Sequence, residues 1–242
     1  MMDTVRINDR KNCRIIAHRG LSGIECENSM PAFVAAGNRS YFGIETDVHV
    51  TSDGKYIIIH DDTTGRVAAG NDHPVEETDY ETLRGIMLAD RGGLTGRTDL
   101  RLPSLDEYLL VCERYGKTSV LELKNHMLPE HVAGIVSAAR ASGHLEKTVF
   151  ISFDLDNMIE LRRMLPEQRL QFLTGGCDAR TLERLKRYRL DLDIYYPSLT
   201  KEIVDEVHAN GLEVNCWTCD NAADAERLIG MGVDYITTNI LE

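Results

Sequence analysis

The chain has 242 residues and a formal net charge of −12, from 27 Lys and Arg against 39 Asp and Glu. This acidic balance argues against a nucleic-acid-binding surface and against a polybasic membrane patch. The length suits a single α/β barrel, so we expect one domain over residues 1–242. No apolar run approaches the ~20 residues of a membrane span, and residues 1–11 lack an apolar signal segment. We therefore expect a soluble, cytoplasmic protein without stable membrane insertion.

In chain order, short apolar runs that predict strands alternate with segments of helical spacing. Apolar residues recur three and four positions apart within 105–112, 132–139, 158–165, 203–207 and 225–229. Strands are predicted at 14–17, 43–48, 119–123, 148–152, 169–173, 192–196, 213–217 and 234–237. Eight strands that alternate with helices predict a TIM (β/α)₈ barrel.

One connection is too short for a crossover helix. Only a few residues separate Val48 from Lys55, so we expect 56–60 to return antiparallel as a hairpin with Asp53-Gly54 at its turn. Folding about residue 53 would place His60 opposite Asp47. The weakly periodic stretch that follows is predicted to be part of a small insertion over the barrel mouth, after the second barrel strand, at about 50–102.

The cysteines carry no framework spacing and are interpreted as reduced cytosolic thiols. Cys216 and Cys219 form a single CxxC without a second pair. Residues three apart on a strand point to opposite faces, so buried thiols are favoured over a metal site.

Polar residues cluster where the predicted strands end, which is where α/β folds build active sites. Glu45 and Asp47 are two apart on one strand and therefore share a face, and Glu122 ends the next barrel strand. A surface or ion-paired carboxylate is the simpler reading for each acid alone, but the three together predict an oxygen-only metal site. Such a site favours Mg²⁺ or Ca²⁺ over Zn²⁺.

Two histidines and two cations lie beside these acids. His18 and His60 are candidates for a catalytic base and acid, although either one alone could be structural. Arg19 and Lys124 offer the positive charge that a phosphodiester needs, or form salt bridges at the barrel mouth. Trp217, the only tryptophan, is expected either to wall the pocket and contact substrate or to pack.

Two further segments flank these residues. His49 is interpreted as a substrate-side or structural residue. The run 27–29 followed by Pro31 predicts a helix start capped by Asn28 or Ser29, from which Glu27 could also reach the site.

These motifs resemble the glycerophosphodiester phosphodiesterase family. The resemblance rests on His18-Arg19-Gly20, Glu27-Asn28-Ser29, Pro31-Ala32-Phe33, Glu45-Thr46-Asp47-Val48, Thr51-Ser52-Asp53-Gly54, His60-Asp61 and Leu121-Glu122-Leu123-Lys124, and continues in Pro103-Ser104-Leu105, Trp217-Thr218 and Thr237-Thr238. It implies a TIM barrel with an insertion after its second strand and hydrolysis of a glycerophosphodiester to an alcohol and glycerol 3-phosphate. By motif position, Glu45, Asp47 and Glu122 would bind a divalent cation. His18 and His60 would act as base and acid, and Arg19 and Lys124 would hold phosphate.

The chain departs from the family pattern at two places. Thr64 stands where the family usually has Leu before an Arg, and Thr238-Asn239 stands where it often has Thr-Asp followed by Pro. We expect both departures to lie outside the chemistry, and the insertion, Arg66 included, to select the leaving alcohol.

Several points stay open from the sequence. The nucleophile is water or the glycerol 2-hydroxyl. The alternatives to a small-molecule glycerophosphodiester substrate are a phospholipase D-like activity on lysophospholipids and a non-catalytic barrel that binds phosphorylated ligands. The alcohol, the metal and the oligomeric state are not determined.

Overall fold

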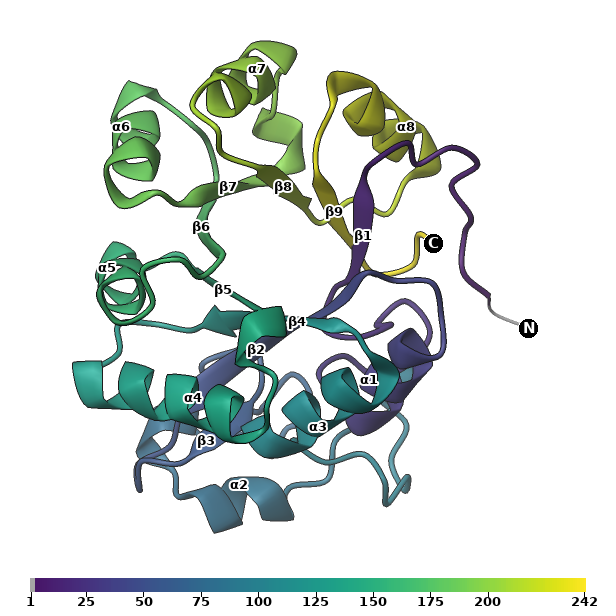
Figure 1. Ribbon diagram of the computed structural model, residues 1–242. Helices are drawn as coiled ribbons and strands as arrows, with labels where there is room; N and C mark the ends of the chain where they lie inside the picture. Colours follow the sequence, from purple (N-terminus) through teal and green to yellow (C-terminus); the bar gives the residue numbers. More distant parts are fainter. Residues whose placement is uncertain (1–2) are drawn as a thin grey trace.

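The computed structural model describes residues 3–242 and consists of a closed barrel of parallel strands surrounded by helices (Figure 1). β1 pairs with both β9 and β2, which closes the ring. The barrel strands are β1 (Arg14–Ala17), β2 (Gly43–Val50), β4 (Thr118–Leu123), β5 (Thr148–Ser152), β6 (Leu170–Thr174), β7 (Asp191–Tyr195), β8 (Val214–Trp217) and β9 (Tyr235–Thr238). The predicted TIM barrel is confirmed, and every predicted strand lies within two residues of an observed one.

Within residues 3–242, seven helices cover the outside of the barrel (Figure 1). They are α1 (Met30–Gly37), α3 (Leu105–Tyr115), α4 (Pro129–Ala141), α5 (Leu155–Met164), α6 (Ala179–Tyr188), α7 (Lys201–Ala209) and α8 (Ala222–Met231). The short helix α2 (Tyr80–Gly85) belongs to the insertion and contacts β3. Local signals set their ends: Ser29 caps α1, and Ser104 with Glu107 forms a capping box on α3. The apolar pattern did not predict α6, because only Leu182 and Leu185 are buried along this strongly charged segment.

The predicted hairpin is present but its register differs by one residue from the expectation. β3 (Tyr56–Ile58) pairs antiparallel with β2, and Val48 lies opposite Ile58. In this register the partner of Asp47 is Ile59, whose amide donates to the Asp47 carbonyl at 3.2 Å. The predicted pairing of His60 with Asp47 is therefore wrong. His60 follows the paired residues of the hairpin, and its side chain lines the cavity at the barrel mouth.

The insertion after the second barrel strand has an apolar cluster of its own, which explains how a weakly periodic segment keeps a defined position. Ile57 and Ile59 contribute to this cluster from the hairpin, and Cys26 from the first loop. The remaining buried members are Val67, Ala68, Val75, Leu83, Ile86, Leu88, Leu100 and Leu102. The insertion is thus anchored beside the hairpin that carries Asp47 and His60.

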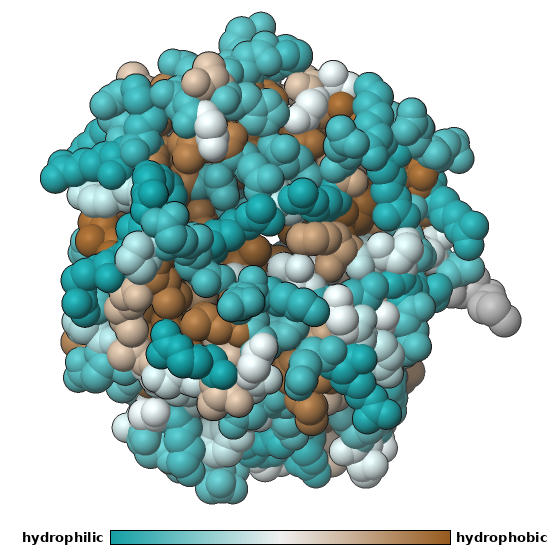
Figure 2. Space-filling view, viewed as in Figure 1, coloured by the Kyte–Doolittle hydropathy of each residue, from teal (hydrophilic) through white to brown (hydrophobic). Residues whose placement is uncertain are grey.

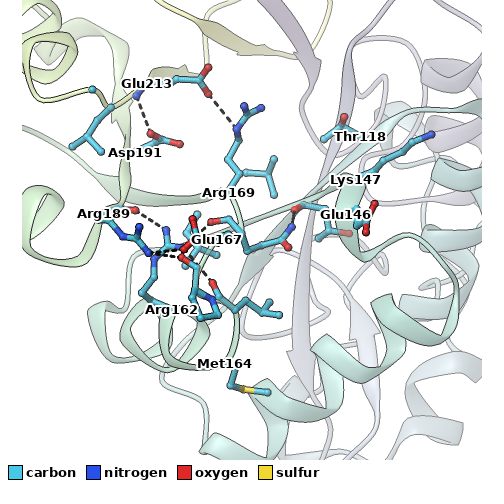
Figure 3. A pocket seen from close by; sticks show the side chains of 18 of the residues that line it. Thr118, Glu146, Lys147, Arg162, Met164, Glu167, Arg169, Arg189, Asp191 and Glu213 are labelled. Atoms are coloured by element: carbon cyan, nitrogen blue, oxygen red, sulfur yellow. Dashed lines mark hydrogen bonds and ion pairs between the residues drawn. The ribbon is translucent and has the colours of Figure 1, made fainter.

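The amino ends of β5 to β8 surround a hollow of about 1,120 Å³ on the face opposite the carboxyl ends of the strands. Figure 3 shows Arg162 and Arg189 reaching into this hollow beside Glu167. Arg162 donates to backbone carbonyls of both neighbouring loops, including Gln168 at 2.9 Å and Arg189 at 2.6 Å. Its guanidinium therefore joins the α5–β6 and α6–β7 connections.

The face of the molecule shown in Figure 2 is mainly hydrophilic, with apolar side chains toward its middle. Among residues 3–242, no helix has the length and apolar character needed to cross a bilayer. All six cysteines are free thiols, and Cys216 and Cys219 are both buried.

Candidate active site

A small cavity of about 100 Å³ lies at the carboxyl ends of the barrel strands. Six of the eight residues predicted to form the site line it: His18, Arg19, Glu45, His60, Glu122 and Trp217. The other two, Asp47 and Lys124, contact these residues from within the wall. The structure thus brings together every residue that the strand-end pattern selected.

The three carboxylates lie together because of strand register. β2 and β4 pair in parallel with Asp47 beside Glu122, and Glu45 shares the face of Asp47. Ligand oxygens of all three acids lie within 4.8 Å of one another, and all three side chains are buried. Burial and the charge of Asp47 raise the pKa of Glu45 well above its usual value and that of Glu122 to about 7.

This carboxylate group fits a divalent cation. Asp47 Oδ1 is buried and accepts no hydrogen bond from any group within residues 3–242, so one of its lone pairs is free for a ligand among the three acids. Burial opposes ionisation of Asp47, yet Arg19 and Lys124 hold its pKa below the usual value. An ionised carboxylate with a free oxygen between two further acids is a suitable donor set for a hard cation.

Arg19 is held in the wall by its backbone and its side chain. Its backbone is left-handed at φ 53°, and its N–H donates to Glu45 Oε2 at 2.8 Å. Gly20 follows at φ 76°, and a Cβ there would lie 2.7 Å from Ala32, so helix α1 requires glycine. The Arg19 guanidinium donates to Glu27 Oε1 at 2.8 Å and lies 3.6 Å from Asp47.

Lys124 follows β4 and contacts two of the acids. Its Nζ lies 2.9 Å from Glu122 Oε1 and 3.7 Å from Asp47 Oδ1. The ammonium and the Arg19 guanidinium therefore approach the carboxylates from different strands, which leaves positive charge on both sides of the site.

His18 is held as a neutral imidazole. Asn239 donates through its Nδ2 to Asp220 at 2.6 Å, which turns its Oδ1 toward His18 Nδ1 at 2.8 Å. His18 must therefore carry its proton on Nδ1, and Nε2 keeps a free lone pair 4.0 Å from Glu45. Burial, helped by the charge of Arg19, lowers the pKa of His18 to about 4.

His60 is oriented by a carboxylate. Its Nδ1 lies 2.7 Å from Asp61 Oδ1, and this bond together with Arg66 lowers the pKa of Asp61 to about 2 in spite of its partial burial. Burial lowers the pKa of His60, while Asp47 and Asp61 act against that shift. Arg66 also donates to Glu27 at 2.7 Å, so one guanidinium joins the partner of His60 to the partner of Arg19.

Sequence reasoning missed three residues that support the site. Asn28 is more than a helix-cap candidate, because its Nδ2 donates to Asp47 Oδ2 at 2.7 Å. Asn239, which was expected to lie outside the chemistry, contacts His18 through its Oδ1. Asp193 lines the cavity floor with one buried oxygen that has no partner. Its position at the middle of β7 gave no strand-end signal.

Two other residues take structural places. His49 is fully buried, with Nδ1 3.0 Å from Glu76 in the insertion. Trp217 does wall the cavity, and its indole N–H is 3.4 Å from the carbonyl oxygen of Asp193. The ring is packed against Phe153 and Tyr195 at the mouth.

At the mouth of this parallel barrel, buried acids surround a free lone pair, and imidazoles and cations face one small cavity. Such a site is suited to the hydrolysis of phosphate esters. The family model for glycerophosphoryl diester phosphodiesterases matches residues 18–242. The chain belongs to that family, as its motifs predicted, and is a phosphoric diester hydrolase.

The similarity to known proteins extends over nearly the full length. A glycerophosphodiester phosphodiesterase of Caldanaerobacter subterraneus subsp. tengcongensis is 30% identical over 93% of each chain. Among solved structures, an Oleispira antarctica phosphodiesterase in complex with the product sn-glycerol-3-phosphate has a TM-score of 0.86 at 25% identity, covering 93% of this chain and 92% of its own. A glycerophosphodiester phosphodiesterase of Parabacteroides distasonis has a TM-score of 0.80 at 27% identity, covering 96% and 94%.

Proposed function

We propose that this enzyme hydrolyses small glycerophosphodiesters to an alcohol and sn-glycerol 3-phosphate, with His18 as base and His60 as acid. The observation that carries the proposal is the pair of imidazoles at one cavity. Each has Nδ1 engaged by a neighbour, which leaves Nε2 for the substrate. The product complex of the Oleispira relative supports the same product for this chain.

The cationic side chains bind the phosphate. Arg19 offers a planar fork and Lys124 a point charge, and both lie beside the acids at the mouth. Trp217 forms the apolar wall of the substrate pocket. Glu45, Asp47 and Glu122 would hold Mg²⁺ or Ca²⁺, which supplies charge neutralisation for the phosphate oxygens.

The two histidines have different hydrogen-bond partners, an amide for His18 and a carboxylate for His60, which suits different roles in acid–base catalysis. His18 is neutral above about pH 4, so its Nε2 accepts a proton from the nucleophile, which is water or the 2-hydroxyl of glycerol. His60 donates a proton to the leaving alkoxide, and the Asp61 carboxylate stabilises its imidazolium form. A cyclic phosphate forms only when the 2-hydroxyl attacks.

The test is release of glycerol 3-phosphate from glycerophosphocholine, with and without a chelator and with Mg²⁺ or Ca²⁺ restored. We expect chelation to abolish turnover and Asp47→Asn to lower it strongly at every metal concentration. Asp205→Asn, which changes an exposed carboxylate on α7, is the matched control. Full activity of chelated enzyme and of Asp47→Asn would remove the metal from the mechanism. Release of phosphate-bearing product from lysophospholipid alone would favour the lipid substrate.

We also propose a cytoplasmic location. It is supported by the six free thiols, four of which are buried in the barrel or under its helices. Cell fractionation followed by thiol labelling of the unfolded protein would test it.

A further inference from the structure

Three aromatic rings form a corner at the barrel mouth. Phe153 follows β5, and Tyr195 and Trp217 end β7 and β8. The rings of Phe153 and Trp217 are nearly perpendicular, at 83°, with centroids 5.6 Å apart. The ring of Tyr195 also contacts Trp217, with centroids 5.5 Å apart and an interplanar angle of 47°. We call these three residues the aromatic corner.

The aromatic corner is continuous with the catalytic cavity and open to solvent. Phe153 and Trp217 line the same cavity as His18 and His60. Phe153 is 50% exposed and Tyr195 is 44% exposed, a large apolar area for a site that faces water. Elsewhere in residues 3–242, arginine or lysine groups lie over the rings of Phe42, Tyr80, Tyr188 and Tyr235, but none lies over the corner.

Two acids follow Phe153 closely in the sequence. Asp154 directly follows Phe153, and its carboxylate lies 3.2 Å from the exposed imidazole of His126. Asp156 belongs to the same group. In the part of the chain that the structure describes, neither acid pairs with a lysine or arginine. The positive groups of the site, Arg19 and Lys124, are largely buried on the side of the acids.

We propose that the aromatic corner binds the quaternary ammonium of a choline head group, which makes glycerophosphocholine the preferred diester. This inference rests on the proposed function and specifies its substrate. Perpendicular aromatic faces attract a large, weakly hydrated cation through their quadrupoles. A neutral glycerol or inositol group gains no such attraction, and a primary ammonium loses more hydration when it enters.

Binding can be measured without turnover, because Trp217 is the only tryptophan in the chain. The probe is choline, and its matched control is 3,3-dimethylbutan-1-ol, which has the same shape and no charge. We expect choline to change the Trp217 fluorescence saturably, with an affinity about tenfold higher than that of the neutral alcohol. Phe153→Leu should abolish most of this difference, since leucine keeps apolar bulk without a π face.

Kinetics give the second readout. The quantity is the ratio of kcat/KM for glycerophosphocholine to kcat/KM for glycerophosphoglycerol in the metal-loaded enzyme. We expect Phe153→Leu and Tyr195→Leu each to lower this ratio by roughly 3- to 10-fold. Tyr188→Leu makes the same change as Tyr195→Leu at the far end of α6 and should leave the ratio unaltered.

The outcomes separate the two proposals. Equal binding of choline and its neutral isostere, or unchanged ratios in both corner variants, would overturn the choline site while leaving the hydrolase intact. Absence of turnover on every diester, with choline still binding selectively, would overturn the proposed function and keep the cation site. Selective binding of choline, together with a kcat/KM ratio that falls in Phe153→Leu and in Tyr195→Leu, supports the choline site and the proposed function.

Discussion

Asn239 is the hydrogen-bond partner of His18 Nδ1. Its amide accepts from Nδ1 and carries no charge, so burial dominates and the imidazole stays neutral. A carboxylate at this position would favour the imidazolium instead. The residue at position 239 therefore has a chemical consequence for the protonation of His18.

A swap of two side chains tests this role. In Asp220→Asn/Asn239→Asp, the amide and the carboxylate exchange places, so no pair of acids is created. We expect the pKa of His18 to rise from about 4 toward the ordinary histidine value. Because the base must be unprotonated, activity would then be lost at a higher pH as the solution is acidified. The measurement is kcat/KM against pH at saturating metal, and coincident acid limbs would contradict the assignment of His18 as base.

Removal of either imidazole gives a second prediction. We expect His18→Ala and His60→Ala each to lower kcat by roughly 10²–10⁴-fold, the usual effect of losing a general acid or base. Circular dichroism should show unchanged folding, because both side chains face the cavity. His208→Ala alters an exposed histidine on α7 and serves as the control. A variant that turns over at the wild-type rate would return its histidine to a structural role.

At the level of single residues, the sequence predicted the site wherever a polar side chain follows an apolar strand. Glu45, Asp47 and Glu122 follow from alternation and strand pairing alone. Asn239 and Asp61 could not be ranked in this way, because their importance depends on which atoms of a histidine they contact. Such contacts depend on side-chain torsions, which no spacing in the sequence encodes.

Among the elements, the β2–β3 hairpin and the insertion carry the most local information. The hairpin was recognisable because its connection is too short for a helix, while its register was missed by one residue. Selection of the leaving alcohol by the insertion, Arg66 included, stays a prediction. In the structure Arg66 contacts Asp61 and Glu27, the partners of His60 and Arg19.

Arg66→Met tests this connection. Loss of both contacts should leave His60 and Arg19 less well oriented and lower kcat/KM by up to about 100-fold, the scale of a small misplacement. Thermal stability should change little, since the Arg66 side chain is half exposed. The control is Arg97→Met, which removes an arginine of the same insertion that pairs with Glu25 and Asp99 away from the cavity. Equal kcat/KM values for the two variants would show that Arg66 has no positioning role.

For the molecule as a whole, the barrel was predictable because eight apolar runs and their helical partners repeat with regular punctuation. Helix α6 was missed because only Leu182 and Leu185 mark its buried face within a strongly charged segment. The closed ring also brings three acids together, and their carboxylates repel one another. This repulsion depends on the complete fold, because Glu45 and Asp47 meet Glu122 only after β2 pairs with β4.

Metal binding should therefore stabilise the entire barrel. A cation that binds only the folded chain adds about 2.7 kcal/mol at a hundredfold excess over its Kd, or about 5–10 °C in Tm for a protein of this size. Differential scanning calorimetry with and without Mg²⁺ or Ca²⁺ measures the shift. Asp47→Asn should abolish it, and an equal shift in that variant would place the ion elsewhere, for example at His126 and Asp156.

The far face of the barrel bears on how the enzyme moves. Arg162 ties two neighbouring loops through several carbonyls at once, so neither loop can open without breaking the contacts of the other. These contacts stiffen the amino ends of β6 and β7. One arginine far from the chemistry thus restrains the face of the barrel that lies opposite the active site.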